Sequence, residues 1–320
     1  MKVLVTGGSG FIGTNLIEDL IAKGYEVRNI DISEPKIQDR RFVWDQVDIT
    51  DYESFEKSVL AFEPDYLVHL AARTDLDGKA IKDYDANITG VANLLKVLHK
   101  LPKLKKIVIT SSKFVTRNGY QVKNQFDYCP HTVYGESKVI TEKLVWEDPP
   151  DCDWCIIRPT SIWGPWFGVP YRNFFDIVRK RMYFHIGHIQ CHKTYGYIGN
   201  TVYQIEQLLF AQTLDPNNKV FYIGDKPAYE INEWADEIAA ELGFKVPTMP
   251  VWFVKSLAKF GDLLSLFHIH FPMQSFRYGN MTNDGTNDMT NTYHFAPETK
   301  YTRLEGVRIT LKWMKDVEGK

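Results

Sequence analysis

Apolar residues in the first half of the chain follow two alternating patterns. Short apolar runs rich in Val, Ile and Leu predict buried strands at residues 3–5, 26–30, 66–70, 106–110 and 155–158. Between them, apolar residues at helical spacing predict helices near 14–23, 51–61, 84–100 and 134–147. Strands that alternate with helices form parallel sheets covered by helices on both faces. We therefore expect an α/β fold built on a doubly wound parallel sheet.

The first predicted strand leads directly into a glycine-rich turn, Thr6-Gly-Gly-Ser-Gly-Phe-Ile-Gly13, which a predicted helix follows. In this order Gly7 allows a tight turn, Gly10 lets the backbone approach a phosphate, and Gly13 lets the helix pack close to the strand. The unpaired N–H groups at the start of the helix attract an anion. Strand, glycine turn and helix together predict a dinucleotide pyrophosphate site in a Rossmann domain.

The second predicted strand is followed by Asp31, about twenty residues beyond the glycine turn. A carboxylate at this position accepts hydrogen bonds from the adenosine ribose hydroxyls and repels a 2′-phosphate, so the sequence favours NAD over NADP. Two alternatives stay open. Asp31 can be an ordinary exposed residue of a turn, and the nearby Arg28, Arg40 and Arg41 can favour NADP.

The pattern changes after Arg158, where glycine and proline interrupt an aromatic-rich stretch. Shorter elements follow, including a predicted strand at 221–223 and an amphipathic helix at 232–242. We expect residues 1–158 and 197–223 to form the NAD-binding domain. Residues 159–196 and 224–320 are expected to form a smaller C-terminal lobe that binds the substrate and closes over the cofactor.

The overall composition is that of an ordinary soluble globular protein, because 44% of the 320 residues are hydrophobic and 24% are charged. The net charge of −2 offers no strong field for nucleic acid or a membrane surface, and no apolar run approaches the length of a membrane span. The chain begins with its first predicted strand, without a signal peptide, and four cysteines are too few for a disulfide framework. We expect a cytoplasmic protein that binds neither nucleic acid nor membrane.

Two groups of Cys and His residues are spaced as metal ligands sometimes are. Cys152 and Cys155 form a C-x-x-C pair, but Cys155 lies in a predicted buried strand, where cysteine packs as a small hydrophobic residue. The second group lies in a glycine-containing stretch without a clear helix and consists of His185, His188, Cys191 and His192. No second cysteine pair completes a metal site with Cys152 and Cys155, and the second group is better explained as a substrate-facing loop, so we expect no metal site.

A candidate catalytic pair is formed by Tyr134 and Lys138, which are four residues apart and share one face of a predicted helix. An ammonium group beside a phenol lowers the phenol pKa and makes tyrosine usable as an acid or base near neutral pH. The same spacing is also common on ordinary helix surfaces. Upstream, however, Thr110-Ser-Ser112 places hydroxyls at the carboxyl end of a predicted central strand, where open parallel sheets bind their ligands.

In these motifs and their order the chain resembles, nearly from end to end, the extended short-chain dehydrogenase/reductase family, particularly its nucleotide-sugar epimerases, dehydratases and reductases. Further segments carry the resemblance: Val47-Asp-Ile-Thr50, His69-Leu-Ala-Ala72, Asn87-Ile-Thr-Gly90 and Arg158-Pro159. The resemblance implies that Ser112, Tyr134 and Lys138 are the catalytic trio. It implies that the cofactor contacts Gly7, Gly10, Phe11, Ile12, Gly13, Asp31, Asp48, Ile49, Leu70, Ala71, Ala72, Asn87, Tyr134, Lys138 and Pro159. It also implies a homodimer in which helices at 84–100 and 134–146 pair between subunits.

Departures from the family pattern narrow the expected reaction. The family's 4,6-dehydratases carry Asp-Glu after the catalytic hydroxyl residue, where this chain has Lys113-Phe114, so dehydration is disfavoured. Ser161 stands where many relatives have asparagine, and it can still donate one hydrogen bond. Lys193 takes the place of a usual arginine, and Arg277 resembles the arginine that grips the substrate diphosphate. The substrate-binding residues implied in this way are Ser112, Ser161, Lys193 and Arg277.

The leading functional hypothesis is an NAD-dependent nucleotide-sugar epimerase or 4-ketoreductase, with Tyr134 as the acid/base for hydride transfer at a sugar carbon. A second hypothesis keeps the chemistry but changes the substrate to a hydrophobic alcohol or ketone, such as a sterol or flavonoid. The aromatic stretch from Trp163 to Phe174 and the missing asparagine motivate it. A third hypothesis is a non-catalytic dinucleotide sensor, which has no need of the complete trio.

Overall fold

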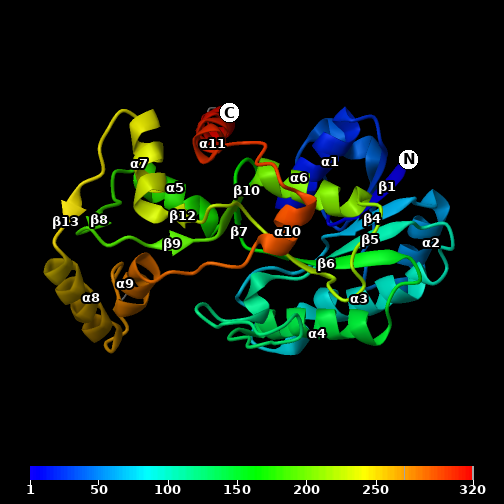
Figure 1. The fold of residues 1–320 in the computed structure, drawn as a ribbon, viewed down its shortest axis with the longest axis horizontal. Helices are drawn as coiled ribbons and strands as arrows, with labels where there is room; N and C mark the ends of the chain where they lie inside the picture. Colours follow the sequence, from blue (N-terminus) through cyan, green and yellow to red (C-terminus); the bar gives the residue numbers. More distant parts are fainter. Residues whose placement is uncertain (270, 319–320) are drawn as a thin grey trace.

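The computed structural model describes residues 1–269 and 271–318, and its larger half is built on one seven-stranded sheet (Figure 1). The strand order is β11-β6-β5-β4-β1-β2-β3, and all neighbouring strands are parallel. The strands are β1 (Lys2–Thr6), β2 (Glu26–Asp31), β3 (Trp44–Gln46), β4 (Tyr66–His69), β5 (Lys106–Thr110), β6 (Asp153–Pro159) and β11 (Val220–Ile223).

Helices cover both faces of the sheet, because successive side chains of a strand point to opposite sides. Val3 and Val5 of β1 pack in one core cluster with α1 and α6, whereas Leu4 packs in another with α2, α3 and α4. These helices are α1 (Phe11–Ala22), α2 (Tyr52–Phe62), α3 (Asp85–Leu98), α4 (Val133–Glu147) and α6 (Ile198–Phe210). The predicted doubly wound α/β fold is therefore confirmed.

The five strands predicted in the first half all form, and the strand predicted at 221–223 is β11. The sequence did not reveal β3, a three-residue strand at the edge of the sheet with the sequence Trp-Asp-Gln. An edge strand with two polar residues out of three lacks the apolar run that marks the central strands.

Apart from α10 (Thr290–Phe295), which packs against α6 and β11 of the larger half, the remaining strands and α-helices form the smaller half at the left of Figure 1. Three two-stranded pairs lie in it: β7 (Ser161–Trp163) with β10 (Tyr195–Tyr197), β8 (His185–Ile186) with β13 (Thr248–Met249), and β9 (His192–Lys193) with β12 (Tyr229–Glu230). The helices of this half are α5 (Tyr171–Arg179), α7 (Ile231–Glu241), α8 (Val251–Ser265), α9 (Ser275–Thr282) and α11 (Arg303–Glu318). Within the described ranges, no helix has both the length and the apolar character needed to cross a bilayer.

An aromatic core holds this half together. The rings of Trp163 and Trp234 are fully buried with their centroids 5.1 Å apart, and Phe175 packs against both. Phe167 packs against Phe175 and is also buried. The aromatic stretch that follows Arg158 therefore supplies core residues.

Candidate active site

The glycine-rich turn between β1 and α1 has the shape of an anion cradle. Gly7 has a φ of +72°, and a Cβ there would lie 2.5 Å from the backbone N of Ala71. A Cβ on Gly13 would lie 2.4 Å from the carbonyl oxygen of Gly7, so close packing excludes a side chain. A Cβ on Gly10 would meet only that same oxygen, at 3.1 Å, because the space above Gly10 is open. The helix begins at Phe11 without a side-chain cap, which leaves its first N–H groups to bind an anion.

Asp31 lies directly beside this turn. Its carboxylate accepts hydrogen bonds from the backbone N–H of Ser9 (3.0 Å) and of Ser33 (2.8 Å). Burial raises its pKa, and these hydrogen bonds act in the opposite direction. The three nearby arginines are engaged elsewhere: Arg28 pairs with Asp45, Arg40 with Glu18 and Arg41 with Glu34. These three guanidinium groups are therefore paired with other carboxylates, and the cation that acts on Asp31 by its charge is Lys36.

Other predicted cofactor residues line the carboxyl ends of neighbouring strands. Leu70, Ala71 and Ala72 follow β4, and Pro159 ends β6. Asp48 accepts hydrogen bonds from the N–H and hydroxyl of Thr50, each 2.8 Å. The buried Ile49 packs against Gly90 of α3, where a Cβ would lie 2.4 Å from its Cδ1.

The side chain of Asn87 forms its hydrogen bonds within the protein. Its amide donates to Ser137 Oγ (2.9 Å) and to the carbonyl of Arg73 (3.1 Å), and its oxygen accepts from the N–H of Arg73 (2.8 Å). The observed role of this side chain is to hold the loop after β4 against α4.

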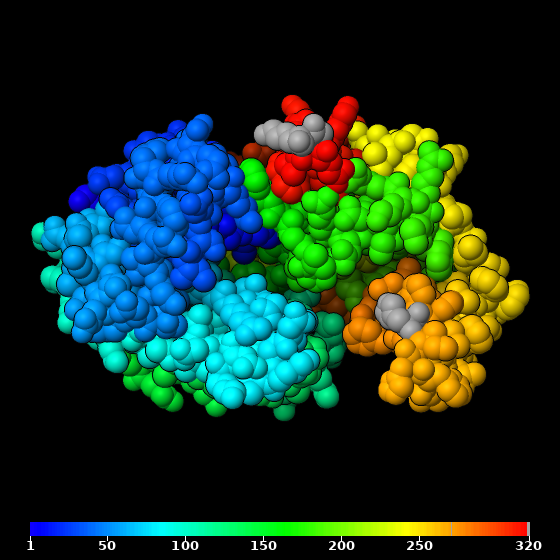
Figure 2. All heavy atoms as spheres, turned by 180° about the vertical axis from the view of Figure 1, so that it is seen from behind, coloured from blue at the N-terminus to red at the C-terminus, as the bar shows by residue number. Residues whose placement is uncertain are grey.

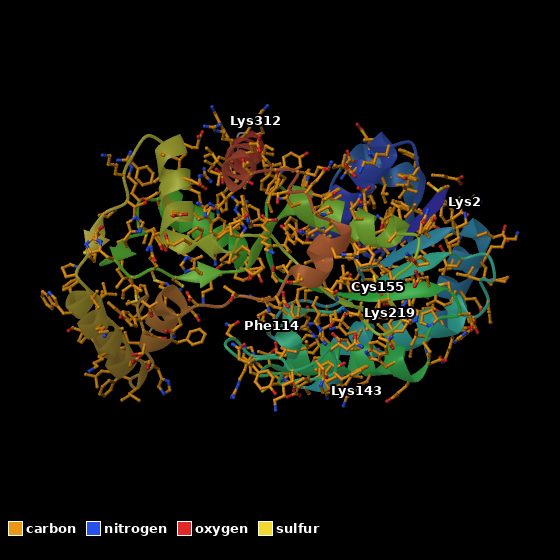
Figure 3. All side chains as sticks on the ribbon, viewed as in Figure 1. Lys2, Phe114, Lys143, Cys155, Lys219 and Lys312 are labelled. Atoms are coloured by element: carbon orange, nitrogen blue, oxygen red, sulfur yellow. The ribbon has the colours of Figure 1, made fainter. Side chains whose placement is uncertain are left out.

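The three predicted catalytic residues come together where β5 ends and α4 begins. Thr132 caps α4 by accepting a hydrogen bond from the N–H of Gly135 (3.0 Å), which places Tyr134 in the first turn. The ring of Tyr134 is buried between Tyr84 and Phe114, with both centroids 5.9 Å away. Phe114 lies at the side of the larger half that faces the smaller one (Figure 3). Burial raises the pKa of Tyr134 to about 12, while a hydrogen bond with Ser112 lowers it.

Lys138 lies one turn further along α4 and is almost fully buried. Its ammonium donates to the carbonyl of Thr110 (3.0 Å), and burial lowers its pKa to about 8. The burial of His69, together with the nearby charge of Lys138, lowers the pKa of His69 to about 3, so His69 is neutral. In the described residues, the buried His69 Nε2 and Thr110 Oγ1 have no hydrogen-bond partner. These orphaned polar atoms and the open space above Gly10 fit a bound dinucleotide.

A buried ion pair behind the trio was not recognised in the sequence. Glu142, one turn beyond Lys138, accepts hydrogen bonds from Arg158 Nε (2.8 Å) and Nη2 (2.7 Å). The same carboxylate accepts from the hydroxyl of Ser111 (2.5 Å), next to Ser112, and of Tyr128 (3.0 Å). The pair therefore ties α4 to the ends of β5 and β6. Glu142 follows Lys138 by four residues and so shares one face of the helix with it, which was the signal in the sequence that could have pointed to Glu142.

Lys113 was also missed as a site residue, although it directly follows Ser112. Its ammonium donates to Ser161 Oγ (2.9 Å) across the site. Burial and the nearby charge of Lys193 lower the pKa of Lys113 to about 8. Lys113 therefore links the segment after Ser112 to Ser161, and Lys193 lies near enough for its charge to act on Lys113. The sequence signal was a lysine in the place where the dehydratases have an acid.

Arg277, the other predicted substrate residue, lies on the exposed side of α9. Among the described residues, no hydrogen bond or ion pair joins it to Lys193 or to the catalytic trio. The chain does connect the two regions, because Gly285, shortly after α9, forms a bridge with Lys193. Convergence of Lys193 and Arg277 on one ligand stays a prediction.

The Cys and His residues with metal-like spacing are dispersed or engaged. His185 uses both ring nitrogens, at 2.9 Å from Asn232 Oδ1 and from Asp236 Oδ1. Cys155 is buried in β6, and burial raises its pKa to about 12. No group of three or more potential metal ligands gathers anywhere in residues 1–269 and 271–318.

Comparison with known proteins gives two kinds of relative. One is a 3-beta-hydroxysteroid dehydrogenase of Mycolicibacterium neoaurum, 28% identical over 270 residues, which cover 78% of this chain and 72% of that protein. Another is an N-acetyl-alpha-D-glucosaminyl-diphospho-ditrans,octacis-undecaprenol 4-epimerase of Escherichia coli O157:H7, 27% identical over 253 residues, covering 78% and 74%.

Solved structures share the fold. The UDP-glucose 4-epimerase of Thermotoga maritima superposes with a TM-score of 0.72 at 22% identity, covering 99% of this chain and 100% of that one. The UDP-glucuronic acid 4-epimerase of Bacillus cereus gives a TM-score of 0.72 at 19% identity, covering 100% and 98%. A family model described as the NAD dependent epimerase/dehydratase family matches residues 3–188. The resemblance found in the motifs is confirmed: this chain is an enzyme of the NAD-dependent epimerase/dehydratase family, within the extended short-chain dehydrogenases/reductases.

Proposed function

We propose that this enzyme is a nucleotide-sugar epimerase or 4-ketoreductase. The observation that carries the proposal is Lys113, which directly follows Ser112, donates to Ser161 and feels the nearby charge of Lys193. Two cations at one place match the charge of a diphosphate and offer nothing to an uncharged alcohol. The Escherichia coli relative, whose name describes a sugar attached through a diphosphate, supports the same substrate chemistry.

In this proposal the trio works on one sugar hydroxyl. Bound NAD supplies the hydride acceptor and donor. Tyr134 Oη takes the hydroxyl proton during oxidation and returns it during reduction. Ser112 donates a hydrogen bond to the same sugar oxygen, and Lys138 holds the cofactor ribose and favours the phenolate by its charge. The Tyr134 pKa of about 12 means that these charges must offset its burial before it acts as a base.

The cofactor preference follows from the surroundings of Asp31. We propose that NAD binds more tightly than NADP, because a 2′-phosphate would lie against this carboxylate. The ion pairs of Arg28, Arg40 and Arg41 support the proposal, since each guanidinium already faces a carboxylate.

A hydrophobic alcohol is the second candidate substrate, because a relative is named as a hydroxysteroid dehydrogenase. The sequence feature that first motivated it was the aromatic stretch after Arg158. Trp163 and Phe167 are buried in the protein core, and Trp166 is half-buried against Trp313. This packing leaves the diphosphate candidate better supported.

The reaction test uses the purified enzyme with NAD or NADH, a panel of UDP- and GDP-sugars, and a 3β-hydroxysteroid. If the enzyme is an epimerase, NMR will show one sugar converted into its epimer. The absorbance of NADH at 340 nm will show no net change. A ketoreductase oxidises one NADH for each 4-keto sugar reduced. Mass spectrometry of any ligand retained through purification identifies the sugar directly. Turnover of the steroid alone would overturn the diphosphate assignment.

A binding test isolates the two lysines. We expect Lys113→Met and Lys193→Met each to weaken UDP binding by roughly 10- to 100-fold, the value of a charge-assisted hydrogen bond. Lys113→Arg should restore much of the UDP affinity. Lys312→Met, which changes an exposed residue of α11, should leave the UDP affinity unchanged. Because the protonated ammonium binds the anion, affinity in the natural enzyme should fall as the pH rises through about 8. Unchanged UDP affinity in both Met variants would contradict the proposal.

A further inference from the structure

The outer end of the smaller half carries an unusual concentration of exposed apolar side chains. Of the twenty large apolar residues exposed in the described chain, eight lie between residues 252 and 276. Trp252, Phe260 and Leu263 lie on α8, Leu266 and Phe267 in the connection, and Phe276 on α9, each between 51% and 79% exposed. We call this region the α8–α9 surface. Figure 1 shows it at the far end from the seven-stranded sheet.

The opposite face of α8 packs against the rest of the smaller half and holds α8 and α9 together as a helical hairpin. Val254, Ala258 and Gly261 are buried, and a Cβ on Gly261 would lie 1.9 Å from the carbonyl oxygen of Met273. Phe260 and Leu263 follow Trp252 by eight and eleven residues, about two and three helical turns, so they share the other face. The buried face makes most of the packing contacts of α8, and on the exposed face Phe260 meets Phe271 edge-on with the ring centroids 5.9 Å apart. A large exposed apolar patch marks an interaction site.

The charges beside this surface have one sign. Between residues 251 and 282 the sequence contains Lys255, Lys259 and Arg277 and a single acid, Asp262. Asp262 accepts a hydrogen bond from the N–H of Ser275 (3.0 Å) inside the hairpin and is only partly exposed. The exposed basic residues have no carboxylate partner in the described residues. The segment thus carries +2, while the whole chain carries −2.

We propose that the α8–α9 surface binds the face of an anionic lipid bilayer. Tryptophan and phenylalanine side chains on a helix enter the headgroup boundary, and flanking Lys and Arg residues contact anionic lipids. A second copy of the chain fits less well, because pairing this surface with itself would bring the basic residues of both copies together. Figure 2 shows the same segment, yellow to orange, projecting at one corner of the molecule, where a flat surface can reach it.

The test measures flotation of the full-length protein with vesicles of phosphatidylcholine, with and without 30 mol% phosphatidylglycerol. We expect binding to the anionic vesicles that weakens as salt is raised. Lys255→Glu/Lys259→Glu should weaken it at least about 25-fold, since each basic residue near the surface contributes about fivefold. Trp252→Ser/Phe260→Ser should weaken it at least about tenfold, because burial of one aromatic side chain is worth that much.

Matched controls change similar residues elsewhere. Phe42→Ser removes an aromatic ring that is 72% exposed, and Lys312→Glu reverses an exposed charge on α11, labelled in Figure 3. Both should bind as the natural protein does, and NAD binding and the unfolding midpoint should show that all variants are folded. Absence of flotation, equal flotation with neutral vesicles, or equal losses in the controls would overturn the proposal. Light scattering that shows self-association abolished by Trp252→Ser, without vesicle binding, would assign the surface to a second copy instead.

Discussion

The buried pair Glu142–Arg158 offers the sharpest test of how the site is held. Arg158→Met keeps a long apolar side chain but removes the two guanidinium donors at 2.7 and 2.8 Å from the Glu142 carboxylate. Both side chains are essentially inaccessible, at 1% and 0% exposure. The stranded carboxylate then keeps only the hydroxyls of Ser111 and Tyr128.

Breaking a buried ion pair from one side costs roughly 3–5 kcal/mol, because an uncompensated charge stays buried. The variant can reduce this cost by protonating Glu142, whose folded pKa would then exceed the value near 4.3 of an unfolded glutamate. The folded variant therefore binds a proton that the unfolded chain releases. Its stability is retained below about pH 4.3 and falls as the pH rises toward the folded pKa, by at most about 1.4 kcal/mol per pH unit.

The assay is urea unfolding of the natural protein and the variant at pH 5 and pH 8. We expect the deficit in the free energy of unfolding to be larger at pH 8. The double variant Arg158→Met/Glu142→Gln removes the stranded charge but keeps an oxygen for Ser111, so its deficit should be smaller and independent of pH. A single variant that loses less than about 1 kcal/mol, or the same amount at both pH values, would refute the reasoning.

Three further predictions concern individual roles in the site. Gly13→Ala should lower the free energy of unfolding, because the added Cβ would meet backbone at 2.4 Å. Gly10→Val, in contrast, should leave the unfolding midpoint nearly unchanged but abolish NAD binding measured by calorimetry. Tyr134→Phe should keep NAD affinity and lose turnover by on the order of a hundredfold or more, the value of positioned acid–base catalysis, and near-normal turnover would remove the assignment. Asp31→Asn keeps a hydrogen-bond acceptor but removes the charge, so the ratio of NADP to NAD affinity should rise in a titration of both cofactors.

The fold was predictable because its signals are local. The strands β1, β4, β5 and β6 each contain a continuous apolar run, and both the glycine turn and the pair Tyr134 and Lys138 are recognised by short local spacing. The edge strand β3 has neither an apolar run nor a buried face, and it was missed. Local pattern therefore predicts the elements that are buried on both sides and fails at the edge.

Residues that act across the fold were harder to predict. Lys113 reaches Ser161, 48 positions later, and Glu142 meets Arg158 only where α4 crosses β6. A single sequence does not state which distant positions will meet, so Lys113 was noticed only as a missing acid. The aromatic stretch after Arg158 was ambiguous for the same reason. An aromatic-rich loop looks the same in the sequence whether its residues line a substrate pocket or, like Trp163, pack in a core.

The net charge of the whole chain is a poor predictor of binding partners, because it sums the charges of surfaces that act independently. The value of −2 favoured a protein with no membrane partner. At ionic strengths near physiological, a charge acts over about 8 Å, so a bilayer would respond only to the residues facing it. On the α8–α9 surface those residues are Lys255, Lys259 and Arg277 among exposed aromatic rings, and the excess acid of the remaining chain lies elsewhere. If the proposed docking is correct, reversing two of these charges should have a larger effect on vesicle binding than changing the total charge by the same amount on α11.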